Sequence, residues 1–206
     1  MGSRSRPQAN TVESAQHRPK GLRARQKILV AARQVFSEVG YERATIRRIA
    51  DAAGVDKSSL TQYFGTKENL FQQSVHWEIP MNLIVGETAS QTAENFTRGI
   101  LMAWAIEPVS PMATLLRASL TNNDAADLLR RHITAQVVDA MEPSIEGDDV
   151  RLRIALAGSM LMGVVSQYYM IQLPDLKIAS TDKIVQLVAP LIRSLIEPGC
   201  TEEGEE

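Results

Sequence analysis

The sequence predicts an all-α protein of about nine helices, and three observations support that fold class. Aromatic residues make up only 5% of the 206 residues, while Ala, Leu, Ile, Val and Met are abundant, a composition that suits helices better than aromatic-rich strands. Apolar residues recur at helical spacings of three and four. No alternating run of useful strand length is present. With 44% hydrophobic residues, the chain can bury one sizeable core or two small ones.

The first three helices have clear start and stop signals. An apolar stripe predicts a helix over residues 23–39, which Gly40 ends in a left-handed cap. Thr45 is a candidate N-cap for a short helix, and a turn at Gly54 separates that helix from a second one over residues 57–64. Two short helices joined by a three-residue turn that contains glycine form a helix-turn-helix.

Beyond this motif, the periodicity predicts longer helices with prolines and glycines at the breaks between them. Thr66 is a candidate N-cap for the first of these, and Pro174 separates the last two. The expected helices cover residues 67–85, 89–105, 111–120, 124–141, 149–172 and 180–196.

Charge is distributed unevenly along the chain, although the net charge is only −2. Residues 1–72 hold 13 Lys and Arg against 6 Asp and Glu, a net charge of +7, whereas residues 73–206 hold 9 against 18, a net charge of −9. Such asymmetry indicates a part that faces nucleic acid joined to a part with another task, the alternative being chance scatter. The sequence therefore predicts a disordered basic tail over residues 1–21, a helix-turn-helix domain over 22–72, a helical domain over 73–199 and a disordered acidic tail over 200–206.

The sequence lacks the residues or motifs that disulfide frameworks, metal sites and common catalytic sites need. A single cysteine, Cys200, excludes a disulfide framework, and His17, His76 and His132 do not have metal-ligand spacing. There is no glycine-rich phosphate loop, nucleophile elbow or HExxH motif. The N-terminus also lacks an apolar stretch with a small-residue cleavage site. We therefore expect a cytoplasmic protein that is not an enzyme and binds neither metal nor cofactor.

A specific motif extends from Arg25 to Phe71 and reads RQKILVAARQVFSEVGYERATIRRIADAAGVDKSSLTQYFGTKENLF. This stretch resembles the N-terminal domain of the TetR family of bacterial transcriptional regulators in uninterrupted register. The resemblance implies a three-helix DNA-binding domain, followed by a larger helical domain that binds an effector and dimerises through its last two long helices. It further implies a homodimeric, sequence-specific transcriptional repressor that an unknown small-molecule effector releases from its double-stranded DNA operator. The alternative is a helical dimeric interaction protein whose helix-turn-helix does not read DNA specifically.

The second short helix of the motif carries the candidate DNA contacts. Leu60 and Phe64 close one face, which leaves cationic, hydroxylic and amidic side chains that suit phosphates and base edges. Thr61 stands where the family usually has tyrosine, and Ser58 where it often has glycine, so the operators of relatives do not define the one read here. The resemblance implies backbone contacts from Thr45, Thr61, Tyr63 and Lys67, and groove contacts from Lys57, Ser58, Ser59 and Gln62.

A run without charged residues extends over 21 residues, from Ile154 to Pro174. This is long enough for a transmembrane helix, but polar residues dilute the run and Pro174 closes it, so we expect no membrane partner. Small residues spaced four apart let a second helix approach closely, and the last helix adds an apolar stripe. The alternative is that both helices fill the core of their own subunit. The candidate dimer interface consists of Ala155, Ser159, Gly163, Ile184, Leu187, Leu191 and Leu195.

Candidate effector contacts are harder to identify from the sequence. Methionine adapts to irregular shapes and aromatic rings supply flat contact area, so both types suit a cavity between the middle helices. For each residue, ordinary core packing is the alternative. The candidate pocket residues are Met81, Met102, Trp104, Met112, Leu115, Met160 and Tyr168.

Overall fold

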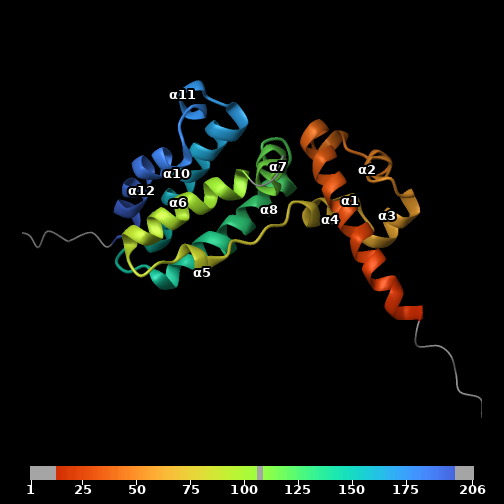
Figure 1. The fold of residues 1–206 in the computed structure, drawn as a ribbon, viewed down its shortest axis with the longest axis horizontal. Helices are drawn as coiled ribbons and strands as arrows, with labels where there is room; N and C mark the ends of the chain where they lie inside the picture. The colour runs from red at the N-terminus through yellow and green to blue at the C-terminus, as the bar shows by residue number, and fades with distance from the viewer. Residues whose placement is uncertain (1–12, 106–108, 198–206) are drawn as a thin grey trace, which may run out of the picture. The chain divides into compact units, whose positions relative to one another are not determined.

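All regular structure is helical in residues 13–105 and 109–197, the part of the chain that the computed structural model describes. Side chains are described from Gly21 onward. The all-α fold class predicted from the sequence is therefore confirmed. The chain divides into two compact units between Ser74 and Val75 (Figure 1).

The first unit is built around α1, which packs against α2 and α4. Ile28, Ile49 and Leu70 come from these three helices and are completely buried. Phe36 on α1 meets Phe71 on α4 edge-on, with 5.0 Å between the ring centroids. This shared core fixes the position of the helix-turn-helix, formed by α2 and α3, on α1. The helices are α1 (Glu13–Arg43), α2 (Ile46–Ala53), α3 (Lys57–Phe64) and α4 (Lys67–Ser74).

The start of α1 differs from the prediction. The helix begins at Glu13, so the structure places residues 13–21, which were expected in a disordered tail, in a helix. Glu, Ala, Gln and Arg favour helix without forming an apolar stripe, so periodicity misses this extension, although Pro19 and Gly21 oppose it. Residues 1–12 and the predicted acidic tail lie outside the described residues. At the other end, Gly40 has a φ of 78° and interrupts the helix where the cap was predicted.

Local signals also account for the turns of the helix-turn-helix. Thr45 is extended, and its hydroxyl oxygen accepts a hydrogen bond of 3.2 Å from the backbone N–H of Arg48. Gly54 takes the left-handed conformation with a φ of 61°, and its N–H donates to carbonyls of the last turn of α2. Asp56 lies at the N-cap of α3, but its side chain accepts no capping hydrogen bond. The Thr45 cap therefore sets the start of α2, and the conformation of Gly54 sets the turn between α2 and α3.

The second unit is a helical bundle in which α6 and α12 pack side by side (Figure 1). Phe96, Leu101 and Ile154 are among the large side chains of its core. Its α-helices are α5 (Met81–Ile84), α6 (Ala89–Ala105), α7 (Pro111–Ser119), α8 (Asn123–Ile133), α9 (Asp139–Met141), α10 (Val150–Val165), α11 (Pro174–Lys177), which was not predicted, and α12 (Thr181–Ile196). The π-segment η1 (Thr134–Val138) continues α8, the 3₁₀ turn η2 (Glu142–Ser144) continues α9, and the π-segment η3 (Ser166–Ile171) continues α10.

The prediction of one helix over residues 67–85 is wrong. The structure divides this stretch into α4 and α5, separated by residues 75–80, which form no helix. Pro80 explains the break, because its ring disfavours helical geometry at the preceding residue and it has no N–H to donate. The N–H of Ile79 instead donates a hydrogen bond of 3.1 Å to Oε1 of Gln136 on η1. This bond attaches the extended segment to the helical bundle of the second unit.

We expect Gly54→Ala to lower the free energy of unfolding by about 1 kcal/mol, because a side chain strains the left-handed conformation. A Cβ at this position would lie 3.4 Å from the flexible Nζ end of Lys27, so backbone strain rather than collision causes the loss. Urea unfolding followed by circular dichroism measures it. Gly158→Ala is the matched control, since an added Cβ there makes only an ordinary contact, 3.9 Å from Cγ1 of Val137, and alanine favours helix. An equal loss in both variants contradicts the prediction.

Candidate nucleic-acid interface and ligand cavities

The two faces of α3 differ in exposure. Leu60 and Phe64 are each 1% exposed and attach the helix to the core of the first unit. The opposite face is polar and open to solvent. It consists of Lys57, Ser58, Thr61, Gln62 and Tyr63, all exposed, with Ser59 half-buried beside them. The predicted DNA contacts of α3 therefore lie together on the side of the helix that faces away from the core.

The hydroxyl groups of Thr45 and Thr61 have different partners. Oγ1 of Thr61 donates a hydrogen bond of 3.0 Å to the carbonyl of Lys57 within α3. Oγ1 of Thr45 accepts its bond from a backbone N–H, so its own proton can be donated to a phosphate oxygen. Thr61 must break its bond to donate in the same way. The geometry therefore favours Thr45 over Thr61 as a donor to the DNA backbone.

Lys67 lies at the start of α4, and its ammonium group already has contacts within the first unit. Nζ donates a hydrogen bond of 3.2 Å to the carbonyl of Glu42 and lies 4.4 Å from the centroid of the Tyr41 ring. The hydroxyl of Tyr41 donates to Oε1 of Glu68 at 3.2 Å. Hydrogen bonds from the Glu68 backbone N–H and then from the Thr66 hydroxyl lower the pKa of Glu68. An ammonium has three protons, so Lys67 can keep the carbonyl contact and still bind a phosphate.

Helices α10 and α12 present an exposed apolar face. Ala155, Ser159 and Gly163 are exposed along α10. Leu187 and Leu191 are 61% and 52% exposed on α12. Exposed apolar side chains gathered on neighbouring helices are characteristic of an interaction site. Leu152 and Leu156, which the sequence did not indicate, are also exposed on α10, as is Met160, which was predicted in the effector pocket.

Ile184, by contrast, lies in the core and not on this apolar face. It is 4% exposed and belongs to the same buried cluster as Ile192 and Ile196. Leu195 is half-buried and packs against that cluster. Helix α12 carries two apolar stripes, one toward the core and one outward, and periodicity alone does not distinguish them.

One described helical segment, Val150–Ile171, is long and apolar enough to cross a membrane by length and composition. Of the 18-residue stretch that makes this segment apolar enough, 22% is buried within the structure. A single segment of this kind is weak evidence for a membrane protein, because helices of soluble proteins meet the same criteria.

Two cavities in the second unit share part of their walls. The larger has a volume of about 490 Å³ and is lined by α5, α6, the start of α7 and residues 77–80. The smaller, of about 320 Å³, is lined mainly by α6, α8, η1 and α10. Trp77, Ile79, Ile100 and Met112 line both cavities. The segment 77–80 therefore forms part of the wall that the two cavities have in common.

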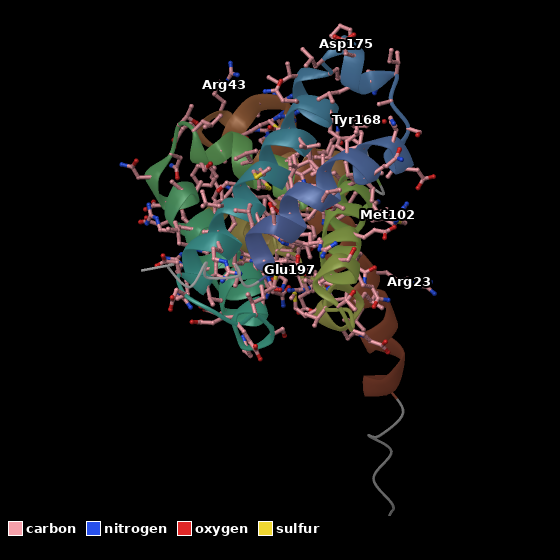
Figure 2. All side chains as sticks on the ribbon, turned by 90° about the vertical axis from the view of Figure 1, so that its left-hand side faces the viewer. Arg23, Arg43, Met102, Tyr168, Asp175 and Glu197 are labelled. Carbon is pink, nitrogen blue, oxygen red and sulfur yellow. The ribbon has the colours of Figure 1, made fainter. Side chains whose placement is uncertain are left out.

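The predicted pocket residues are distributed over several environments. Met102 and Met112 line the larger cavity. Figure 2 shows Met102 and Tyr168, which come from two separate segments, α6 and η3. The others lie elsewhere: Trp104 beside a separate cavity of about 250 Å³, Leu115 completely buried, Met160 exposed on α10, and Met81 and Tyr168 half-buried against the core.

Trp77 and Ile79 are cavity residues that the sequence analysis missed. The expectation of one continuous helix over residues 67–85 concealed the extended segment on which they lie. Pro80 was the available signal, since a proline inside an apparent helical pattern marks a probable break at the residue before it.

His76, Trp77 and His132 form a cluster beside the smaller cavity. Nδ1 of His76 lies 3.2 Å from Nε2 of His132, and the rings of Trp77 and His132 are 4.5 Å apart between centroids. Burial lowers the pKa of His132, and the positive charges of His76 and Arg131 lower it further. The cluster therefore favours a neutral His132. No group of three or more His, Cys, Asp or Glu side chains in the described part of the chain is placed to hold a metal ion.

Comparison with known proteins accounts for both units. Residues 28–73 match the family described as bacterial regulatory proteins, tetR family. Residues 90–196 match the tetracyclin repressor-like C-terminal domain. The chain belongs to the TetR family. In this TetR-family protein, α2 and α3 form the helix-turn-helix within the matched N-terminal region.

Curated relatives of this TetR-family protein match it over a short stretch. The HTH-type transcriptional repressor AcnR of Corynebacterium glutamicum is 48% identical over 52 residues, which are 25% of this chain and 28% of that protein. The HTH-type transcriptional repressor Rv1474c of Mycobacterium tuberculosis is 40% identical over 47 residues, or 23% of this chain and 25% of that protein. The chain thus spans about a quarter of the length of these relatives.

Solved structures are similar over most of the chain. A TetR-family regulator from Streptomyces coelicolor A3 has a TM-score of 0.60 and 28% identity, covering 85% of this chain and 95% of that one. The multidrug binding protein EbrR, solved with malachite green, has a TM-score of 0.59 and 15% identity, covering 84% of this chain and 97% of that one. At that identity the likeness to EbrR shows a shared fold.

We expect the TetR-family protein to lose stability as the pH falls below about 6.5, the ordinary pKa of histidine. Because folding lowers the pKa of His132, the unfolded chain binds the proton first, and stability declines from the unfolded pKa down to the folded one. Urea unfolding at about pH 7.5 and about pH 5.5 measures the decline. His132→Gln should reduce it, whereas the control His76→Gln, which leaves His132 able to titrate, should reduce it less. An unchanged decline in His132→Gln contradicts the assignment.

Proposed function

We propose that the protein is a homodimeric, sequence-specific transcriptional repressor of the cytoplasm that a small-molecule effector releases from its operator. The observation that carries this proposal is the exposed polar face of α3, supported from behind by the buried Leu60 and Phe64. A short helix held in this way can enter the major groove with its polar side chains toward the bases. The positive net charge of the N-terminal third favours binding to phosphates.

The proposed contacts divide into those that read bases and those that hold the DNA backbone. In the groove, the Gln62 amide can bond N6 and N7 of adenine, and Lys57 can reach O6 and N7 of guanine. Ser58 and Ser59 lie beside them on α3. The proposed backbone contacts come from Thr45, Thr61, Tyr63 and Lys67, of which Thr45 and Lys67 lie at helix N-termini that favour a phosphate.

The apolar face of α10 and α12 is the proposed dimer interface. A two-fold dimer uses the same patch on both subunits, so Leu187 and Leu191 contact the equivalent helices of a second copy. The exposed small residues Ala155, Ser159 and Gly163 let the two copies of α10 approach closely. Two reading helices related in this way recognise half-sites about 34 Å apart.

The cavities of the second unit are the proposed effector site. The larger, of about 490 Å³, falls within the range of roughly 300 to 1,000 Å³ typical of small-molecule sites. Its walls come from several helices, so a ligand there contacts elements that are far apart in the sequence.

A second candidate function is that of a helical dimer whose helix-turn-helix does not read DNA specifically. The hydrogen bond from Thr61 to the Lys57 carbonyl favours it, because this bond occupies a donor that a DNA contact would use. A salt-dependent mobility-shift assay with the DNA upstream of the protein's own gene separates the two functions. Specific binding supports the repressor, and equal binding to unrelated DNA supports the alternative.

We expect Gln62→Ala to relax specificity at one base pair of the operator, at a cost of about 1 to 3 kcal/mol for the preferred base.

Lys67→Ala should instead weaken binding to all sequences alike and flatten the salt dependence, because it removes a phosphate contact. Binding to a panel of single-base operator variants at several salt concentrations measures both effects. Unchanged discrimination in Gln62→Ala, or a sequence-selective loss in Lys67→Ala, contradicts the assigned roles.

We expect Gly163→Arg to convert the dimer to a monomer and to abolish cooperative operator binding, since it places a charge in the proposed interface. An added Cβ at Gly163 meets nothing within 4 Å, so the subunit itself should fold normally. Sedimentation analysis measures the mass, and circular dichroism checks the fold. Ala135→Arg, at an exposed position on η1, is the control and should remain dimeric. A Gly163→Arg variant that stays dimeric contradicts the interface.

A further inference from the structure

The charged groups that line the larger cavity are paired or directed to solvent. Nη1 of Arg98 lies 2.6 Å from Oδ1 of Asp182, and Nη2 lies 3.7 Å from Oε1 of Glu94. The Glu78 side chain is 82% exposed and lies 3.6 Å from the ring of His76. An ionised ligand would lose its hydration in this cavity without gaining an unpaired opposite charge from the described side chains.

The smaller cavity also offers no unpaired charge to an ionised ligand. Its wall is mostly apolar, and its titratable residue His132 favours the neutral form, because burial lowers the pKa of this side chain. Oε1 of Gln136 already accepts the hydrogen bond from the N–H of Ile79, and the side chain carries no charge. The electrostatics of both cavities therefore favour a ligand without net charge.

Trp77 has a buried donor that is not satisfied. Its Nε1 is closed to solvent and has no hydrogen-bond partner among the described residues. A buried donor without a partner raises the free energy of the protein, and an acceptor that reaches it recovers that cost. Trp77 lies on the non-helical segment 76–80 and lines both cavities, so a ligand in either cavity contacts this residue.

Trp104, the other tryptophan of the chain, provides a contrast. Its Nε1 donates to Sδ of Met112 at 2.9 Å, and the residue is 3% exposed. Trp104 lines neither of the two adjoining cavities. The two indoles are therefore chemically identical groups, of which Trp104 has a hydrogen-bond partner and Trp77 has none among the described residues.

We propose that the effector is a neutral, predominantly apolar molecule with a hydrogen-bond acceptor, and that the indole N–H of Trp77 recognises this acceptor. The inference rests on the proposed function, in which these cavities are the effector site. It adds the chemical class of the ligand and the residue that selects it.

Three probes that share two phenyl rings test the proposal by calorimetric titration of the full chain without DNA. Diphenylmethane has no acceptor, benzophenone adds a carbonyl oxygen, and diphenylacetate adds a negative charge. We expect benzophenone to bind about tenfold more tightly than diphenylmethane. Diphenylacetate should bind most weakly, because its carboxylate finds no unpaired cation.

Trp77→Phe removes the N–H but retains an aromatic ring. It should weaken both uncharged probes similarly through lost volume and abolish the preference for benzophenone. The matched control Trp104→Phe should retain that preference. Ultraviolet irradiation of bound benzophenone, which attaches it to nearby C–H groups, should label Met102 or Met112 in the larger cavity, as mass spectrometry would show.

The proposal is overturned by equal binding of diphenylmethane and benzophenone, by tighter binding of diphenylacetate, or by no binding of any probe. A preference for benzophenone that survives Trp77→Phe also overturns it. Failure of the proposed function has a different signature: the probes bind in the expected order, but the protein does not bind DNA specifically in the mobility-shift assay.

Discussion

The break in the helix between Ser74 and Met81 is the constraint on which the cavities of the second unit depend. Pro80 prevents the chain from continuing as a helix, so the N–H of Ile79 must find another acceptor, and it finds Oε1 of Gln136. That hydrogen bond holds an extended segment against the bundle, and the segment places Trp77 in the wall shared by both cavities. A continuous helix would satisfy its own backbone groups and leave this wall unbuilt.

Helix α12 connects the cavity region with the proposed dimer face. Its inner stripe, which includes Ile184, packs in the core beside α6, while its outer stripe carries Leu187 and Leu191. Arg98 on α6 lines the larger cavity and binds Asp182 in the first turn of α12. Because this ion pair is largely exposed, it contributes little stability. Its consequence is geometric, since it joins a wall of the cavity to a helix of the proposed interface.

How much of the structure the sequence predicts depends on where the determining contacts lie. The helix-turn-helix follows from signals within a few residues, such as the Thr45 cap and the positive φ of Gly54, and it was predicted closely. The extended segment depends on Gln136, which is 57 residues away from Ile79 in the sequence. The position of Trp77 in the cavity wall depends on the same distant contact, because Trp77 lies on this segment. The core position of Ile184 was likewise hidden, because only tertiary packing decides which apolar stripe of α12 faces inward.

The exposed polar face of α3 also depends on both local and distant contacts. Leu60 and Phe64 need the core of the first unit to fix the helix, whereas Thr61 satisfies its hydroxyl within α3 by donating to the carbonyl of Lys57. A short side chain bonded to its own helix projects little toward a partner, so Thr61 contributes less to the surface than the longer Lys57 and Gln62. In the proposed complex, base discrimination is therefore concentrated in Lys57 and Gln62, because they combine exposure, reach and the donors that base edges require.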